Sequence, residues 1–140
     1  MEYIGKELLY LSKQHRALLA KRLSDIQLFP GQDGLLYYLS LQDGQSMSSL
    51  VEKLQIQHAT LFKMVERMAK EELLRKYKDP ADMRTSVIYL TDKGKIKLKE
   101  LAKIWKEIEL ILSDGLSEEE KNFFFKIVHK ISGNMNPFLK

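Results

Sequence analysis

One short segment interrupts a chain whose apolar residues otherwise recur at the spacing of α-helices. Residues 85–91 read Thr-Ser-Val-Ile-Tyr-Leu-Thr and are rich in the β-branched and aromatic residues that favour strands. The preceding basic run at 75–78 and the turn residues at 79–82, Asp-Pro-Ala-Asp, complete a β-hairpin with a long tip. This hairpin is the only β signal in the sequence. We therefore expect a mainly α fold with a small β-hairpin.

Apolar residues on both sides of this hairpin recur at intervals of three and four, which is the spacing of one face of a helix. They predict helices over about residues 2–24, 30–42, 46–54, 58–72, 91–113 and 117–133. Pro30 is expected in the first turn of the second helix, because that position needs no amide donor. Ser46, Thr91 and Ser117 are expected N-caps, and Gly133 and Pro137 are expected to end the last helix.

The fourth predicted helix combines an apolar stripe with a charged face. The stripe has positions 0, 3, 4 and 7 and consists of Leu61, Met64, Val65 and Met68. The opposite face carries His58, Lys63, Glu66, Arg67 and Lys70. A short helix, a tight junction and a second helix with an exposed polar face are typical of a helix-turn-helix. A basic hairpin directly after a helix-turn-helix is the wing of a winged-helix domain.

The basic charge is concentrated in the middle of the chain. Residues 50–100 hold twelve Lys and Arg against eight Asp and Glu, whereas the counts balance at five and five before this segment and at six and six after it. A localised basic segment favours a polyanion such as double-stranded DNA. The alternative is an ordinary solvated face.

Composition narrows the class of protein. The 140 residues fit a single domain, no apolar run approaches the length of a membrane span, and there is no cysteine. His15, His58 and His129 lie far apart, and no phosphate-binding or nucleophile motif occurs. We therefore expect a soluble cytoplasmic protein that is not an enzyme and that needs no metal or cofactor.

Residues 50–94 resemble the core of the MarR family of winged-helix transcriptional regulators. The matching features are the leucine spacing of the third helix, Thr60 and Lys63 on the fourth, an Asp-x-Arg motif at 82–84, and Leu-Thr-x-x-Gly at 90–94. The resemblance implies one MarR-like domain over 1–140, with a winged helix-turn-helix lobe at 30–91 and dimerisation helices from both termini at 1–25 and 92–140. It implies a homodimeric repressor that binds a palindromic operator and is released by a small aromatic or phenolic effector.

Two departures from the family pattern stand out. Many members have a glycine where Glu72 stands, so the fourth helix is expected to end differently, for instance one residue later. Many members also have an arginine near the start of this helix, where residues 57–59 read Gln-His-Ala. The base preference is therefore expected to differ from the commonest pattern of the family.

The predicted DNA contacts lie at the start of the fourth helix and on the wing. Gln57 can pair with adenine, Lys63 with guanine or phosphate, and Thr60 with a thymine methyl group or phosphate. Arg84 can enter an A·T-rich minor groove, and the resemblance implies that Asp82 orients it. The full set is Ser46, Ser48, Gln57, His58, Ala59, Thr60, Lys63, Arg67, Arg75, Lys78, Asp82 and Arg84. For the residues of the fourth helix, the alternative to DNA contact is an ordinary solvated face. For Asp82, the alternative to orienting Arg84 is an ordinary turn aspartate.

The terminal helices carry more large apolar residues than a small lobe needs. Neighbouring helical residues point about 100° apart, so the three phenylalanines at 123–125 cannot all face one core. We expect a homodimer interface formed by Ile4, Leu8, Leu11, Phe123, Phe124, Ile127 and Val128. A thicker monomer core is the alternative.

An effector pocket is predicted from the place that the family gives it. The residues that fall there are His15, Arg16, Tyr37 and Tyr38. Arginine can bind a carboxylate and tyrosine can donate to a phenol. The alternative to an effector pocket is that these side chains only pack in the fold and that the arginine lies on the surface. For the whole protein, a winged-helix protein-interaction module without specific DNA readout remains the alternative, and a small enzyme lacks a matching site.

Overall fold

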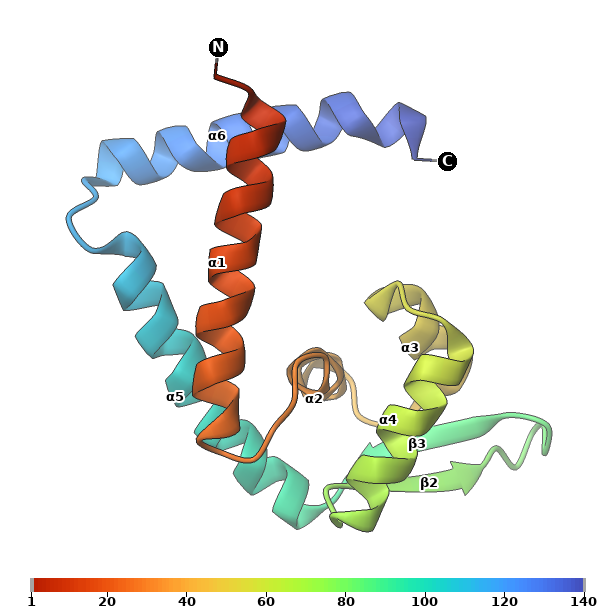
Figure 1. Cartoon of the computed structure of the whole chain (residues 1–140). Helices are drawn as coiled ribbons and strands as arrows, with labels where there is room; N and C mark the ends of the chain where they lie inside the picture. Colours follow the sequence, from red (N-terminus) through yellow and green to blue (C-terminus); the bar gives the residue numbers. More distant parts are fainter. Residues whose placement is uncertain (1, 140) are drawn as a thin grey trace. The chain divides into compact units, whose positions relative to one another are not determined.

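The computed structural model describes residues 2–139 of the chain (Figure 1). The elements in order are α1 (Ile4–Ser24), α2 (Gln32–Leu41), β1 (Gln45–Ser46), α3 (Met47–Leu54), α4 (His58–Lys70), β2 (Leu74–Lys78), β3 (Ser86–Leu90), α5 (Asp92–Ser113), α6 (Glu118–Met135) and the 3₁₀ turn η1 (Asn136–Phe138). They form two compact units, residues 1–105 and 106–140, with the boundary inside α5. Among the described residues, no helix has the length and apolar character that crossing a membrane requires.

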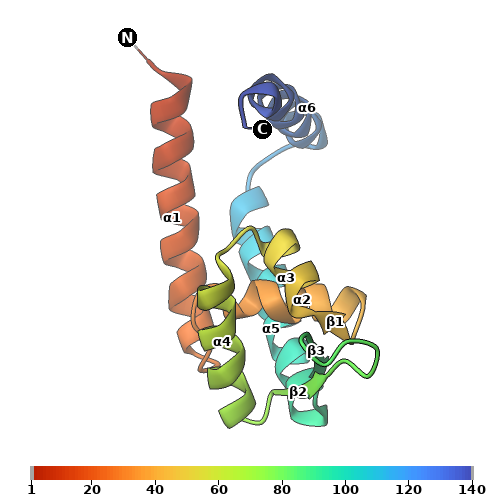
Figure 2. The same ribbon diagram turned by 90° about the vertical axis from the view of Figure 1, so that its right-hand side faces the viewer.

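The first unit contains a three-stranded antiparallel sheet in the order β1-β3-β2 (Figure 2). β2 and β3 form the predicted hairpin, in which Leu74 pairs with Leu90 and Lys78 with Ser86. β1 was not predicted, and it adds a third strand to the predicted hairpin. Gln45 and Ser46 pair with Ile88 and Val87. A strand of two residues is too short to show an alternating pattern, so the sequence carries no signal for it.

The core of the first unit lies between the helices α1–α5 and the inner face of the sheet. Its buried members are Leu23, Leu28, Leu35, Leu36, Leu39, Met47, Leu50, Leu61, Val65, Met68, Leu73, Leu74, Ile88 and Leu101. The predicted stripe of α4 is confirmed, because Leu61, Val65 and Met68 are buried and Met64 packs against them. This burial leaves the opposite face of α4 free for solvent or a ligand.

Two predicted helix ends differ from the structure. α2 begins at Gln32 rather than Pro30, because Gly31 is the N-cap residue, with a φ of 99°. The Asp33 carboxylate accepts a hydrogen bond from the Gly31 amide at 2.9 Å. α6 continues through Gly133, contrary to expectation, and ends at Met135, before the 3₁₀ turn that contains Pro137, as expected of that proline. A single glycine lowers helix stability without ending a helix.

The end of α4 corrects the expectation drawn from Glu72. Glu72 adopts the left-handed conformation, with a φ of 62°, which favours glycine. The Leu73 amide bonds to the Met68 carbonyl at 2.9 Å and the Glu72 amide to the Ala69 carbonyl at 3.0 Å. This is the Schellman pattern, in which the helix ends through its own backbone. The helix therefore ends in the usual way, with a non-glycine residue in the left-handed position.

The Leu-Thr-x-x-Gly motif joins the start of α5 to the end of α4. The Thr91 hydroxyl accepts from the Gly94 amide at 2.9 Å, which confirms the predicted N-cap, and it donates to the Glu72 carbonyl at 2.5 Å. A β-carbon at Gly94 would lie 2.1 Å from the carbonyl oxygen of Leu73. Only glycine allows this approach.

The second unit contains the end of α5 and the helix α6, the blue ribbon in Figure 1. The predicted capping box is confirmed: the Ser117 hydroxyl accepts from the Glu120 amide at 3.1 Å, and the Glu120 carboxylate accepts from the Ser117 amide at 2.8 Å. α6 has no buried residue. Its exposed apolar side chains include Phe123, Phe124, Phe125, Ile127 and Val128.

Candidate nucleic-acid interface

The junction between α3 and α4 is fixed by backbone geometry and one cap. The Ser46 hydroxyl accepts from the Ser49 amide at 3.1 Å, which confirms the predicted N-cap of α3. Gln55 ends α3 in the left-handed conformation, with a φ of 53°. Gln57 is the N-cap residue of α4, and its side chain makes no capping hydrogen bond. Its amide is therefore available at the end of α4 that the helix-turn-helix motif directs at DNA.

The first two turns of α4 gather most of the predicted base contacts. Gln57, His58, Ala59, Thr60 and Lys63 are all exposed. Ser48 is exposed on α3, whereas the Ser46 hydroxyl is engaged in its cap. The structure thus brings the helical part of the predicted set onto one surface.

A buried glutamine holds α3 against α2, and sequence reasoning missed it. Gln45 is 3% exposed. Its amide group donates to the carbonyls of Tyr38 and Gln42, both at 2.7 Å, and its oxygen accepts from Lys53 Nζ at 2.5 Å and from the Ser49 hydroxyl at 3.3 Å. All of its usual hydrogen-bonding capacity is satisfied. Because α4 follows α3 directly, this network also positions α4.

Cations lie on both flanks of α4. Arg67 stacks over the Phe29 ring at 3.9 Å from the centroid, and its Nε lies 3.9 Å from the Glu71 carboxylate. The structure thus places this predicted DNA contact against the segment between α1 and α2. On the other flank, Lys76 of β2 lies 4.6 Å from the centroid of the Phe62 ring and 2.5 Å from the Glu66 carboxylate. Phe62 and Glu66 were not among the predicted site residues.

The tip of the wing contains the predicted Asp82–Arg84 pair. Arg84 Nε and Nη2 lie 3.1 and 3.3 Å from the two carboxylate oxygens of Asp82, and the Arg84 amide also donates to Asp82 at 3.1 Å. The Arg84 side chain, followed by its amide, holds the pKa of the Asp82 carboxyl below its usual range. The Arg84 side chain is 90% exposed, so the pair presents an ordered cation to solvent.

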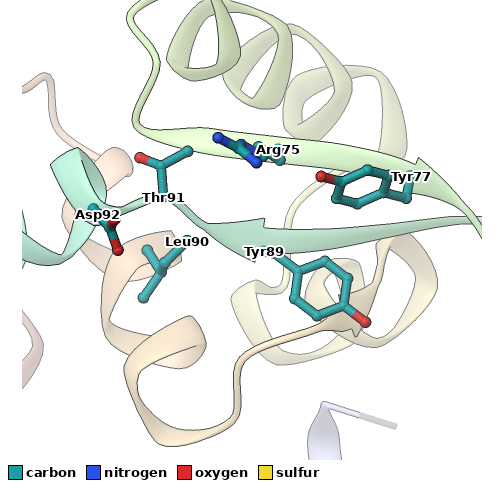
Figure 3. A pocket seen from close by; sticks show the side chains of 6 residues that line it. All are labelled: Arg75, Tyr77, Tyr89, Leu90, Thr91 and Asp92. Carbon is teal, nitrogen blue, oxygen red and sulfur yellow. The ribbon is translucent and has the colours of Figure 1, made fainter.

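The two faces of β2 carry different groups. Lys76 contacts α4, so alternation places Lys78 on the same face and Arg75 on the other. Figure 3 shows Arg75 beside Tyr77 and Tyr89, whose rings meet edge to face with centroids 5.8 Å apart. These residues line an open hollow of about 290 Å³ together with Leu90, Thr91 and Asp92. Arg75 therefore faces away from α4, and the strand residue directed at α4 is Lys76.

The predicted effector residues fall into two groups. Tyr37 meets Tyr38 and Trp105 edge to face, at centroid distances of 5.3 and 5.7 Å. Trp105 is an addition that the sequence did not identify. His15 and Arg16 are exposed on α1, and Arg16 Nη2 donates to the Ser12 hydroxyl of the same helix at 3.4 Å. Within residues 2–139, no three His, Asp or Glu side chains group closely enough to hold a metal ion.

Comparison with known proteins identifies the family. The model of the MarR family matches residues 31–86. The transcriptional regulator HosA of Escherichia coli O111:H- is 30% identical over 125 residues, which cover 89% of this chain and 91% of HosA. The chain belongs to the MarR family. This confirms the resemblance seen in the sequence and makes the protein a DNA-binding transcriptional regulator rather than an enzyme.

Solved structures confirm the MarR-type winged helix. BpsR of Bordetella bronchiseptica superposes with a TM-score of 0.82 at 27% identity, over 94% of this chain and 99% of BpsR. The repressor CouR, solved with a 23-mer DNA duplex, gives a TM-score of 0.84 at 21% identity, over 93% of this chain and 92% of CouR. The predicted fold class is therefore correct, with β1 added to the wing.

Proposed function

We propose that this regulator is a cytoplasmic repressor that binds a palindromic operator as a homodimer. Residues 30–91 bind the DNA, and residues 1–25 and 92–140 provide the dimer contacts. The observation that carries the proposal is the joint placement of an exposed α4 N-terminus and an ordered arginine at the wing tip on one small lobe. CouR, which shares the fold, was solved on duplex DNA.

The dimer part of the proposal rests on exposed apolar side chains. Ile4, Leu8 and Leu11 of α1 are exposed, as is the apolar face of α6. The first half of α1 projects beyond α2–α4 in both views (Figures 1 and 2). Exposed apolar surface of this kind marks an interface. A second copy of the chain provides matching surfaces because a two-fold interface uses the same patch twice.

Operator geometry tests this proposal. A two-fold dimer places its two α4 helices in major grooves about one helical turn, or roughly 10 base pairs, apart. Footprinting of the region upstream of the gene should show an imperfect palindrome with that spacing and A·T-rich flanks under the wings. Inserting about five base pairs between the half-sites should reduce binding towards the non-specific level. Equal protection of both half-sites after the insertion would contradict two-fold docking.

Arg84→Ala tests the wing separately from the helix. Loss of the minor-groove contact should cost on the order of 1–3 kcal/mol of operator binding while the fold is retained. Asp82→Ala should cause part of the same loss, because it removes the group that orients Arg84. Tighter binding by Asp82→Ala would show that the carboxylate merely repels DNA.

We also propose a small aromatic or phenolic acid as the effector. The DNA binding of BpsR is regulated by 6-hydroxynicotinic acid, a molecule of this class. Tyr37, Tyr38 and Trp105 provide aromatic surface, and Arg16 is the candidate for the carboxylate. Trp105 is the single tryptophan of the chain, so its fluorescence reports on this cluster. Hydroxynicotinic and hydroxybenzoic acids should quench it in the wild type and more weakly in Arg16→Ala; equal quenching would remove Arg16 from the site.

The alternative is a winged-helix module that binds protein instead of specific DNA. Phosphate contacts release counterions, so DNA binding falls steeply with salt. Salt-dependent binding to the operator that is tighter than binding to a mixed-sequence duplex of the same length would reject this alternative, and equal affinities for the two duplexes would support it.

A further inference from the structure

Lys76 joins the wing to α4 through two contacts on the same helix. Its ammonium group lies 2.5 Å from the Glu66 carboxylate and 4.6 Å from the centroid of the Phe62 ring. Phe62 and Glu66 are four residues apart, so they lie one above the other on one side of α4. The ring and the carboxylate thus hold the side chain at the edge between the helix and the wing.

This edge belongs to the surface that we assign to DNA. Glu66 follows Lys63 by three residues, which places the two side chains one turn apart on neighbouring positions of the exposed face. Phe62 is 46% exposed even though Lys76 lies over its ring. The side chains of Lys76 and Glu66 are 30% and 45% exposed. Solvent, and therefore a phosphate group, can reach the pair.

An exposed ion pair adds little to stability, because solvent screens it. The ion pair has a larger effect on the binding of anions by Lys76, because the Glu66 carboxylate offsets the positive charge where a polyanion would approach. A phosphate can accept the same charge-assisted hydrogen bond as the carboxylate. The two acceptors therefore compete for one ammonium group.

We propose that Lys76 is a phosphate-binding residue that Glu66 holds back. Phe62 keeps the lysine at the edge of the site, and the Glu66 carboxylate lowers the affinity for DNA by competing with phosphate. The proposal rests on the proposed function, in which α4 and the wing face duplex DNA. It makes Glu66 a residue that limits affinity, although it lies on the DNA-binding helix itself.

The test compares Glu66→Gln with Glu71→Gln. Both substitutions remove one negative charge from α4 or its C-cap, and the two carboxylate side chains have similar exposure, 45% and 42%. Glu71 lies on the other flank, 3.9 Å from Arg67 Nε and beyond hydrogen-bond distance, so Glu71→Gln changes the charge of the helix without freeing a hydrogen-bonded cation. Affinity would be measured by fluorescence anisotropy with a labelled mixed-sequence duplex of about three helical turns, over a range of salt concentrations.

Glu66→Gln should bind this duplex at low salt several-fold more tightly than Glu71→Gln. Its salt dependence should also be steeper by about 0.9, the slope added by one further neutralised phosphate. Lys76→Gln should abolish this difference: Glu66→Gln/Lys76→Gln should match Glu71→Gln/Lys76→Gln in affinity and slope. Far-ultraviolet circular dichroism and thermal unfolding would verify that each variant is folded.

Each other outcome has a distinct meaning. Equal affinities and slopes of Glu66→Gln and Glu71→Gln, with wild-type binding intact, would overturn the competition and leave the proposed function standing. A gain in Glu66→Gln that persists without Lys76 would overturn the role of Lys76. Weaker binding by Glu66→Gln would show that the carboxylate positions the lysine for DNA and does not restrain it. Absence of salt-dependent binding by the wild type would reject the proposed function itself.

Discussion

Helices α2–α4 of the first unit and α6 of the second differ in the burial of their apolar residues. In the first unit, the apolar stripes of α2, α3 and α4 meet one another and the sheet, and their central residues are buried. In the second unit, α6 carries a stripe of the same helical spacing, yet none of its residues is buried. The first unit therefore completes a core within one chain. The apolar face of α6 is not covered in this way, which is why we propose that a second copy of the chain covers it.

The comparison separates two kinds of information in a sequence. Periodicity states which face of a helix is apolar, and it does so equally well for α4 and α6. It does not state whether the covering surface comes from the same chain. That depends on which elements the topology places opposite each stripe.

The largest effect is expected from a charge in the proposed interface. Phe124→Asp should abolish dimerisation at micromolar concentration, because two desolvated carboxylates would face apolar surface. Phe125→Asp is the matched control, since the residue lies about 100° further around the helix and the two side chains are 51% and 52% exposed. Sedimentation velocity would measure both variants. A wild-type monomer, or dissociation by both variants alike, would break the proposed contrast between the units.

The next effect tests whether the first unit is self-sufficient. Leu61 is fully buried in α4, so Leu61→Ala should lower the free energy of unfolding by about 2–5 kcal/mol. The loss should be the same in the wild type and in the Phe124→Asp background, because the two residues belong to different compact units. Urea unfolding followed by circular dichroism measures both. A much smaller loss in one background would show that the core depends on dimerisation.

A smaller effect compares the two serine N-caps, one in each unit. Ser46→Ala should lower the stability of the first unit by about 1 kcal/mol, because it removes the cap of α3 inside a packed lobe. Ser117→Ala removes the cap of a helix without buried residues. In the Phe124→Asp background it should increase amide hydrogen exchange in α6 and leave the unfolding midpoint of the first unit unchanged. A shifted midpoint would mean that α6 contributes to that core.

The smallest effect is confined to the wing tip. Arg84→Ala should raise the pKa of Asp82 towards the ordinary aspartate value of about 3.9, because the side-chain hydrogen bonds are the main cause of its depression. A group with a lowered pKa stabilises the fold above its unfolded pKa, and this contribution is lost as the pH falls through the folded pKa. The Asp82–Arg84 pair should therefore be intact at neutral pH and should open only when the pH falls below the range in which an ordinary aspartate titrates. Carboxyl chemical shifts followed by NMR would show it; an unchanged pKa in Arg84→Ala would reject the assigned cause.

The helices and the hairpin were predictable because their signals are local, whereas the Asp82–Arg84 pair was implied by the family resemblance. Apolar residues at intervals of three and four predict the buried stripe of α4, and the turn residues at 79–82 predict the tip of the wing. β1 and the role of Gln45 were not predictable, since a two-residue strand has no pattern and a buried glutamine looks like a surface one. The partners of Arg67 and Lys76 depend on which elements become neighbours in the fold. Glu72 was misjudged because a missing glycine does not prevent the left-handed conformation; it only makes that conformation less favourable.

The short strand β1 limits how this sequence can change during evolution. Ser46 is paired with Val87 in the sheet and is also the N-cap of α3, so strand and helix share one residue. A single inserted residue here would either turn β1 over relative to β3 or separate the helix from its cap. The tip of the hairpin between β2 and β3 has no such double role, and its exposed turn can change length. Relatives of this protein should therefore differ in length at the wing tip, where DNA contacts can diversify, and keep a constant length between β1 and α4.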